Sequence, residues 1–515
     1  MSEPTPYDTV PYASHAYPGT HPDRMAGMAK LFGMTPALPS NCRVLELGSA
    51  AGGNLMPMAH HYPDSEFVGI DLSAVEIAEG VEHMGELGIR NLTLEARDIL
   101  EVGDRYGQFD YIICHGVYSW VPGPVQTEIM RLCRTLLNPQ GVAYISYNCL
   151  PGWHMRGVIR NMMFYHAAPF TEPEEKIQQA RAMLNFLAST MPEGTDAYSV
   201  LLKSEAEFLS KMSDYYLFHE HLSPDNEALY FHQFLQRAVD SELQFLGEAS
   251  LTTMLPEQFP PEVRDVLGQI SGDIARMEQY MDFVRNRTFR QTLLVHQEVE
   301  IDRTLDWNDI TPFSLATKAK APADAVLDDR SEVTFETDEQ TIVSEEPLVK
   351  IALAELADAW PQAVAFQELA DTVVKRVGDD SEDARSTLGS NLLRCIAGGI
   401  LEYWTEPPAT RSAGETPTCW SFTRFQLDAG IQRLTTLRHQ TADVSPVIRR
   451  TLSWMNGERT KDQIVACLVQ DALDGVLTVS KDEEPMDDRD ELIEVFEQVY
   501  DEIVETAQDQ SFLVG

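Results

Sequence analysis

The sequence predicts an α/β protein: a doubly wound, Rossmann-like sheet with a helical insertion, followed by winged-helix-like α+β units. Three observations lead to this prediction. Short apolar runs alternate with helical patterns over residues 43–148, a mainly helical stretch follows at about 154–240, and short helices and strands fill the remainder. Strands that alternate with helices are typical of a parallel, doubly wound sheet. A length of 515 residues also favours several domains over one.

The first five strands are predicted by short apolar runs. These runs lie at 43–47, 66–71, 91–98, 109–116 and 142–148. Helical periodicity between them predicts helices at 53–63, 73–88 and 124–141, and Ser73 stands where a helix is usually capped. The carboxyl ends of such strands share one edge of the sheet, which is where ligands bind in this class of fold.

The rest of the chain divides into an insertion and three further parts. Two strand-like runs at 243–250 and 289–299 are expected to complete the first sheet, which makes the helices before them an insertion. Residues 316–330 are rich in Ala, Pro and charge with little periodicity, as in a linker. The predicted parts are an N-terminal lid (1–40), the sheet domain (41–315), the linker (316–330), a winged-helix-like middle domain (331–410) and an acidic, winged-helix-like C-terminal domain (411–515).

Composition disfavours several classes of partner. The net charge of −42 argues against nucleic acid, because phosphate contacts need clustered Lys and Arg, and it permits lysine-rich protein partners. Solubility or a salty habitat would explain the same charge. The sequence has no apolar run long enough for a membrane span, no secretory-signal pattern in its first residues, and no C-x-x-C pair among its seven cysteines. These features predict a cytoplasmic protein without membrane association.

The segment ELGSAAGGN, residues 46–54, lies where the first strand turns into the first helix. Gly48 and Gly52 let a ligand approach the backbone closely. The spacing is not G-x-G-x-x-G, and the carboxylate of Glu46 suits a cationic ligand better than a pyrophosphate. An NAD dehydrogenase is therefore disfavoured, whereas S-adenosylmethionine, with its amino group and sulfonium, fits the segment.

Two further acids end the next strands. Asp71 ends the second strand, where a carboxylate can accept hydrogen bonds from both hydroxyls of a ribose that lies across the strand ends. Asp98 ends the third strand and is placed to take the adenine amino group, with Arg97 and Ile99 beside the ring. The alternative is a Rossmann-like domain that binds nothing and uses these residues only to form turns.

Residues 44–147 resemble a class I S-adenosylmethionine-dependent methyltransferase. The resemblance rests on Glu46, Gly48, Gly52, Asp71 and Asp98 at successive strand ends. Ala50 stands where the family often has a glycine. The resemblance implies S-adenosylmethionine as the cofactor, and the predicted cofactor-binding residues of this region are Glu46, Gly48, Ser49, Ala50, Gly52, Asn54, Asp71, Leu72, Arg97, Asp98, Ile99 and His115.

A longer set of segments narrows the resemblance. Over residues 7 to about 300 the chain is similar to a bacterial family with a methyltransferase regulatory domain, in the segments YDTVPYASHAYPGTHPDRMAGMAKLFG, HGVYSWVP, YNCLPGW, YYLFHEHLSP and DFVRNRTFRQTLLVH. The best-characterised members are protein-lysine methyltransferases that act on outer-membrane proteins. The resemblance implies methylation of protein lysines, in an outer-membrane protein before its export. The acidic charge of the chain favours a lysine-rich acceptor.

The loops after the fourth and fifth strands supply aromatic side chains at the same edge. A lysine must arrive neutral, and an apolar, aromatic channel disfavours its ammonium form. The predicted catalytic residues are His115, Tyr118 and Trp120. Tyr118 and Trp120 are expected to form the walls of the channel, and His115 is expected to lie near the sulfonium or to accept a proton. Asn148 and Trp153 are predicted substrate-binding residues, together with Tyr118 and Trp120. Packing of the loops would explain both tryptophans equally well.

The N-terminal residues are expected to fold over the cofactor as a lid. Tyr17, His21 and Arg24 are predicted to bind the cofactor, with Arg24 paired to its carboxylate, and Tyr12 is predicted to bind the substrate. A solvated arginine on a surface helix is the alternative. The HEH segment at 219–221 is not predicted to hold a metal, because residues two apart on a helix do not face one another.

Two other functions remain open from the sequence. One is a small-molecule O- or N-methyltransferase with His115 as general base. The other is a protein-interaction module that binds S-adenosylmethionine and acts through its winged-helix-like parts. The helical insertion also offers a surface on which two copies could form a homodimer.

Overall fold

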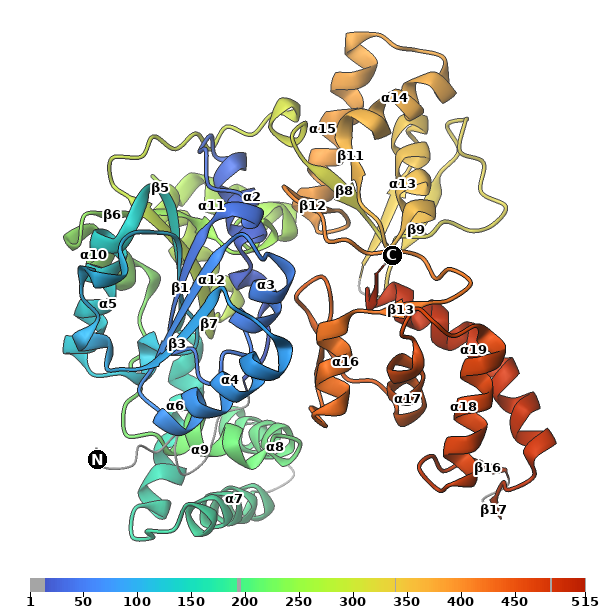
Figure 1. Cartoon of the computed structure of the whole chain (residues 1–515). Helices are drawn as coiled ribbons and strands as arrows, with labels where there is room; N and C mark the ends of the chain where they lie inside the picture. The colour runs from blue at the N-terminus through green and yellow to red at the C-terminus, as the bar shows by residue number, and fades with distance from the viewer. Residues whose placement is uncertain (1–13, 192–195, 339, 482–483, 515) are drawn as a thin grey trace. The chain divides into compact units, whose positions relative to one another are not determined.

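The computed structural model describes residues 14–191, 196–338, 340–481 and 484–514, and the chain forms two compact units (Figure 1). The first unit holds Asn41–Ile301, Met34–Ala37 and Ser14. The second unit holds His15–Gly33, Leu38–Ser40 and Asp302–Gly515. These units differ from the predicted domains in two places. The division follows Ile301 rather than residue 315, and most of the described part of the predicted lid belongs to the second unit.

The first unit contains a seven-stranded sheet in the order β3-β2-β1-β4-β5-β7-β6. β1 to β5 pair in parallel, whereas β7 runs antiparallel to both β5 and β6. The predicted doubly wound sheet is confirmed, and so is its completion by two later strands. The strands are β1 (Arg43–Leu47), β2 (Glu66–Asp71), β3 (Leu92–Ala96), β4 (Phe109–Cys114), β5 (Leu137–Asn148), β6 (Leu243–Glu248) and β7 (Phe289–His296).

The helices between the strands form largely where their periodicity predicts. The Ser73 hydroxyl accepts a hydrogen bond from the backbone N–H of Glu76 at 3.2 Å, which confirms the predicted cap. The third predicted helix was placed too long: it ends at Leu136, because Pro139 disfavours helical backbone in the residue before it and β5 begins at Leu137. These helices are α3 (Leu55–His61), α4 (Ala74–Leu87) and α5 (Gly123–Leu136).

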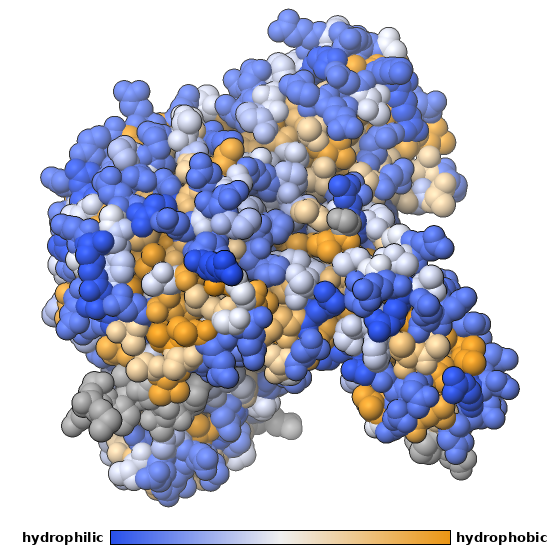
Figure 2. All heavy atoms as spheres, in the orientation of Figure 1, coloured by the Kyte–Doolittle hydropathy of each residue, from blue (hydrophilic) through white to orange (hydrophobic). Residues whose placement is uncertain are grey.

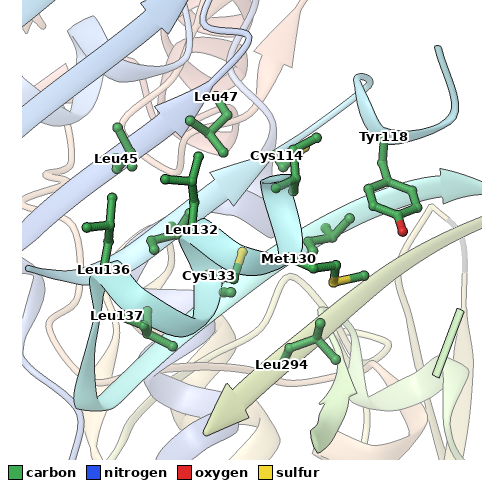
Figure 3. Close-up of a cluster of buried hydrophobic side chains, with 14 of the residues drawn as sticks. Leu45, Leu47, Cys114, Tyr118, Met130, Leu132, Cys133, Leu136, Leu137 and Leu294 are labelled. Atoms are coloured by element: carbon green, nitrogen blue, oxygen red, sulfur yellow. The ribbon is translucent and has the colours of Figure 1, made fainter. Parts of the chain in front are cut away.

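The core of the first unit lies between α5 and the sheet (Figure 3). Leu132, Cys133 and Leu136 of α5 are at most 2% exposed and belong to one apolar cluster with Leu45 and Leu47 of β1. Burying a leucine side chain stabilises a fold by about 1.5–3 kcal/mol. This packing holds β1 and β4 rigidly, so the residues at their carboxyl ends are fixed in position.

The helical insertion between β5 and β6 has its own small core. Ile159, Leu184, Leu202 and Leu217, from four different helices, are buried together there. Further helices lie between β6 and β7, at 261–270 and 274–285, and the sequence pattern predicted neither of them. The helices are α6 (Gly152–Ala167), α7 (Pro173–Thr190), α8 (Ala197–Ser210), α9 (Asp214–Leu222), α10 (Phe231–Asp240), α11 (Pro261–Ile270) and α12 (Ile274–Arg285).

The second unit begins with a helical domain on a three-stranded sheet in the order β11-β8-β12. The central strand β8 (Ser314–Ala316) precedes the helices in the chain, so residue 316 of the predicted linker lies in a strand. A separate hairpin is formed by β9 (Val333–Glu336) and β10 (Thr341–Ser344). The remaining elements are α13 (Pro347–Ala359), β11 (Val364–Ala365), α14 (Phe366–Val377), α15 (Glu382–Gly398) and β12 (Glu402–Trp404).

Four helices and several two-residue strands complete the second unit. Their core contains Leu452, Ile464, Leu468 and Phe496. In the described ranges of both units, we find no helix long and apolar enough to cross a membrane. The elements are β13 (Thr418–Cys419), α16 (Ser421–Asp428), β14 (Leu434–Thr435), β15 (Thr441–Ala442), α17 (Pro446–Trp454), α18 (Lys461–Leu473), β16 (Ser480–Lys481), β17 (Glu484–Pro485), α19 (Arg489–Asp509) and β18 (Leu513–Val514).

Candidate functional site

Glu46 lies near the carboxyl end of β1 and is only 3% exposed. Its Oε1 accepts a hydrogen bond from Asn54 Nδ2 at 2.8 Å, whereas Oε2 has no hydrogen-bond partner among the described residues. Burial raises the pKa of Glu46 to about 8, and the nearby Asp71 carboxylate adds to the rise. The side chain is therefore largely protonated at neutral pH until a cationic group approaches it.

The glycine turn follows directly. Gly48 has a φ of +81°, and a Cβ there would clash with the Val117 side chain. Ala50 also adopts a positive φ, of 48°, so the alanine keeps the backbone that a glycine would adopt readily. Asp71 at the end of β2 accepts from the backbone N–H of Ala50 at 2.8 Å and from that of Ser73 at 2.9 Å. One carboxylate thus ties the turn to the neighbouring strand.

Two serines border the turn. The hydroxyl of Ser49 is buried and has no hydrogen-bond partner in the described ranges. The backbone N–H of Gly53 donates to Ser14 Oγ at 2.7 Å, so a residue far upstream closes the turn. The sequence reasoning missed Ser14. Ser14 lies in the N-terminal segment that was expected to fold over the cofactor, and this expectation could have indicated it.

The end of β3 is partly apolar and partly charged. Asp98 Oδ1 accepts from the backbone N–H of Leu100 at 2.9 Å. Leu100 is 49% exposed, and Leu72, which follows Asp71, is 54% exposed. Arg97 pairs with Glu95 at 2.6 Å, so its guanidinium already has a partner. Ile99 packs against the core cluster.

His115 directly follows β4. Its Nδ1 lies 2.9 Å from the hydroxyl of Tyr144 on β5, and burial lowers the pKa of His115 to about 4. The next residue is fixed too, because the backbone N–H of Gly116 donates to Ser146 Oγ at 2.8 Å. The imidazole is therefore held in one place and is neutral at physiological pH.

We expect an NMR titration to give a midpoint near pH 4 for His115, with the signal assigned through its loss in His115→Gln. The unfolded chain gains this proton near pH 6.5, whereas the folded chain gains it only near 4. This residue's contribution to stability is thus present above pH 6.5 and is lost as the pH falls toward 4. A midpoint above 6 would contradict the buried, neutral placement.

The predicted channel walls Tyr118 and Trp120 and the predicted substrate-binding residue Trp153 differ in placement. Tyr118 belongs to the buried cluster drawn in Figure 3 and is 1% exposed. Its ring centroid lies 6.5 Å from that of Tyr147 and 5.5 Å from that of Phe234. This burial favours packing over substrate contact for Tyr118. Trp120 is half-buried and meets Trp153 edge-on at 5.9 Å. The substrate roles of these residues stay predictions.

Asn148 ends β5 and lies opposite the first residue of β7. It is 3% exposed, and its Nδ2 has no acceptor among the described residues. The opposite residue is Phe289, which is 38% exposed and whose ring centroid lies 6.1 Å from that of His115. The sequence reasoning predicted a strand there but missed Phe289, because the strand's direction could not be inferred from its apolar run.

The predicted lid residues engage partners within the second unit. The Arg24 guanidinium lies over the Trp404 ring, 4.1 Å from its centroid, and 3.8 Å from a carboxylate oxygen of Glu402. His21 caps α2 (Pro22–Leu31), where its Nδ1 accepts from the Asp23 N–H. The Tyr17 carbonyl accepts from the backbone N–H of Thr20 at 2.9 Å. Their cofactor roles stay predictions, and Tyr12 lies outside the described residues.

Three polar atoms at the carboxyl ends of the strands fit a ligand. Glu46 Oε2, Ser49 Oγ and Asn148 Nδ2 are all buried without a hydrogen-bond partner in the described part of the chain. Leaving such an atom unpaired costs about 1–3 kcal/mol. Bound ligands that offer a cationic amino group and oxygen acceptors would supply partners to these atoms. In the same described ranges, we find no group of three His, Cys, Asp or Glu side chains that could hold a metal.

Family models match most of the chain. A methyltransferase domain matches residues 38–209, a "predicted methyltransferase regulatory domain" matches 213–296, and a "PKMT, C-terminal winged helix domain" matches 415–512. The last match confirms the predicted winged-helix-like fold at the C-terminus. The chain is also 32% identical over its whole length to an uncharacterized protein of Rickettsia prowazekii (strain Madrid E), of which it covers 94%.

Solved structures give the same relationship. The structure of PKMT2 from Rickettsia typhi in complex with AdoHcy matches 98% of this chain and 100% of its own, with a TM-score of 0.88 and 31% sequence identity. A second structure of PKMT2 from Rickettsia typhi also matches 98% of this chain and 100% of its own, with a TM-score of 0.87 and 30% identity. The similarity therefore extends through both units of the chain and includes a protein with a bound product of S-adenosylmethionine.

Proposed function

We propose that this chain, which belongs to the family of S-adenosylmethionine-dependent methyltransferases with a regulatory domain and a PKMT winged-helix domain, methylates lysine side chains of proteins. One observation supports the proposal. Glu46, Asp71, the glycine turn and the buried unpaired atoms lie at the carboxyl ends of the parallel strands, in a chain that resembles PKMT2 over its full length. We expect the acceptor to be a lysine-rich or outer-membrane protein and the reaction to occur in the cytoplasm.

The ends of β1, β2 and β3 would hold S-adenosylmethionine, which supplies an electrophilic methyl group when bound. Glu46 would hold the amino group, because a buried carboxylate with a free oxygen attracts a cation. Asp71 would accept from the ribose hydroxyls, and Asp98 from the adenine amino group. The exposed Leu72 offers apolar surface beside Asp71 for the nucleoside.

The acceptor amine must lose its proton before it can attack. A dry, aromatic surrounding favours the neutral amine by desolvation. His115 is a weak proton acceptor at neutral pH, because its pKa lies near 4, so the proton of the amine passes to solvent as the amine enters. One ring nitrogen of His115 already lies within hydrogen-bond distance of Tyr144. We propose that His115 orients the incoming amine, while Trp120 and Asn148 border its path.

The buried Glu46 makes cofactor binding depend on pH. Its pKa of about 8 should fall when an ammonium binds, so binding releases a proton below pH 8. We expect the affinity for S-adenosylmethionine to rise between about pH 6 and 8 and to be nearly constant in Glu46→Gln. Calorimetry in two buffers of different ionisation enthalpy measures the proton release. No release in the unmodified protein would contradict this role of Glu46.

Methyl transfer into a cell lysate tests the acceptor class. Labelled S-adenosylmethionine is added with the unmodified chain or with Asp71→Ala, and the lysate is split into protein and small-molecule fractions. We expect Asp71-dependent label in the protein fraction. Label only in the small-molecule fraction would support a small-molecule methyltransferase. Cofactor binding without any transfer would favour a binding module. Sedimentation of the purified chain tests whether it forms a homodimer.

A further inference from the structure

Phe289 occupies an unexpected place in the sheet. β7 runs antiparallel to β5, so its first residue lies at the edge where the parallel strands end. Phe289 is paired there with Asn148, and directly opposite residues of an antiparallel pair share one face of the sheet. The Phe289 ring and the unpaired Nδ2 of Asn148 therefore lie on the same face of the site edge.

Phe289 is partly exposed to solvent, unlike the core residues of the same strand. It is 38% exposed, whereas the core residues of β7, such as Leu293 and Leu294, are fully buried. The ring meets His115 edge-on, with centroids 6.1 Å apart and planes at 83°. The two rings thus meet at the site, and the exposed part of Phe289 is open to a ligand. Hydrophobic side chains do reach the visible face of the molecule among hydrophilic ones (Figure 2).

Buried charges hold this ring in position. Arg290, the next residue, is fully buried and pairs with Glu248, Glu278 and Asp282 at 2.7–2.9 Å. Arg287 donates to the backbone carbonyl of Phe289 at 3.0 Å and pairs with Glu248 at 2.8 Å. The start of β7 is therefore anchored on both sides of the phenylalanine. An anchored aromatic ring is suited to select a ligand, because it loses little freedom on binding.

We infer that Phe289 contacts the side chain of the acceptor lysine and sets the affinity for it. This inference rests on the proposed function. The alkyl part of a lysine would pack on the exposed ring, and a methylated ammonium would be held by the aromatic face. The Asn148 amide on the same face donates to a carbonyl oxygen of the acceptor backbone. Phe289 takes no part in holding the cofactor.

The test compares Phe289→Leu with Phe283→Leu as the matched control. Phe283 on α12 is 47% exposed and contacts Tyr230 and Tyr280 rather than His115. The acceptor is the protein fraction of a cell lysate in a dilution series, with methyl-lysine read by mass spectrometry. We expect kcat/KM for the acceptor to fall about tenfold in Phe289→Leu and to recover in Phe289→Tyr. AdoHcy affinity should stay within about twofold in all variants.

The outcomes separate the inference from the proposed function. If the unmodified chain labels lysine and Phe289→Leu behaves like Phe283→Leu, the inference is wrong and the proposed function stands. If Phe289→Leu loses AdoHcy affinity as well, the residue supports the cofactor site and the inference is wrong. If the unmodified chain labels no lysine although it binds AdoHcy, the proposed function fails and the inference fails with it.

Discussion

Replacing Asp71 with alanine is expected to weaken S-adenosylmethionine binding by about 100-fold or more. The carboxylate accepts from the backbone N–H groups of Ala50 and Ser73, so its loss releases the glycine turn as well as the proposed ribose contact. Each hydrogen bond to a charged group contributes about 1.5–3 kcal/mol, and two of them account for at least this factor. Calorimetric titration with S-adenosylmethionine measures the change.

The control for this prediction lies at the opposite end of the same strand. Asp64 is exposed and precedes β2, far along the strand from the turn. Asp64→Ala should therefore bind the cofactor like the unmodified chain. Asp71→Asn keeps the size of the side chain and one acceptor oxygen. Its affinity for S-adenosylmethionine should lie between those of Asp71→Ala and Asp64→Ala. Equal affinity in Asp71→Ala and Asp64→Ala would show that the turn and the ribose do not depend on Asp71.

Replacing Arg290 with methionine is expected to destabilise the first unit by about 3–5 kcal/mol. The change leaves Glu248, Glu278 and Asp282 buried without their common partner, and an uncompensated buried charge has a cost of this size. Thermal unfolding of the full chain, followed by the loss of AdoHcy binding, reports on this unit. Arg264→Met, at an exposed position on α11, is the matched control and should change little.

The pH dependence distinguishes this mechanism from lost packing. Burial already raises the pKa of Glu278 to about 7, and removal of Arg290 should raise it further. A carboxyl group with a raised folded-state pKa contributes stability at low pH that is lost as the pH rises through that value. Arg290→Met should therefore be more destabilised at about pH 8 than at about pH 6. A loss of stability in Arg290→Met that is equal at both pH values would indicate lost packing alone.

The positions of the predicted cofactor-binding residues at the strand ends were largely predictable because their determinants are local. Glu46, Gly48 and Gly52 lie within one strand and the turn that follows it, and a short apolar run that ends in an acid identifies Asp71 in the same way. The N-cap at Ser73 follows from neighbouring residues too. Local patterns of this kind place residues at strand ends without knowledge of the strand order.

The surroundings of the proposed acceptor path were less predictable because they depend on distant pairing. Phe289 reaches the site through the antiparallel register of β7 with β5, which no apolar run encodes. Tyr118 follows β4 at the site edge, yet its ring enters the core beside Phe234 of the insertion. Arg24 similarly has partners, Glu402 and Trp404, that lie far along the chain. Sequence spacing cannot anticipate contacts of such long range.

Identification of the methylated side chain tests whether the chain methylates protein lysines. Proteins labelled from S-adenosylmethionine by the unmodified chain are digested, and the methylated side chains are identified by mass spectrometry beside the Asp71→Ala control. We expect methyl groups on the Nζ atoms of lysines, present with the unmodified chain and absent with the variant. Asp71-dependent label found only on other side chains, or only on small molecules, would contradict protein-lysine methylation.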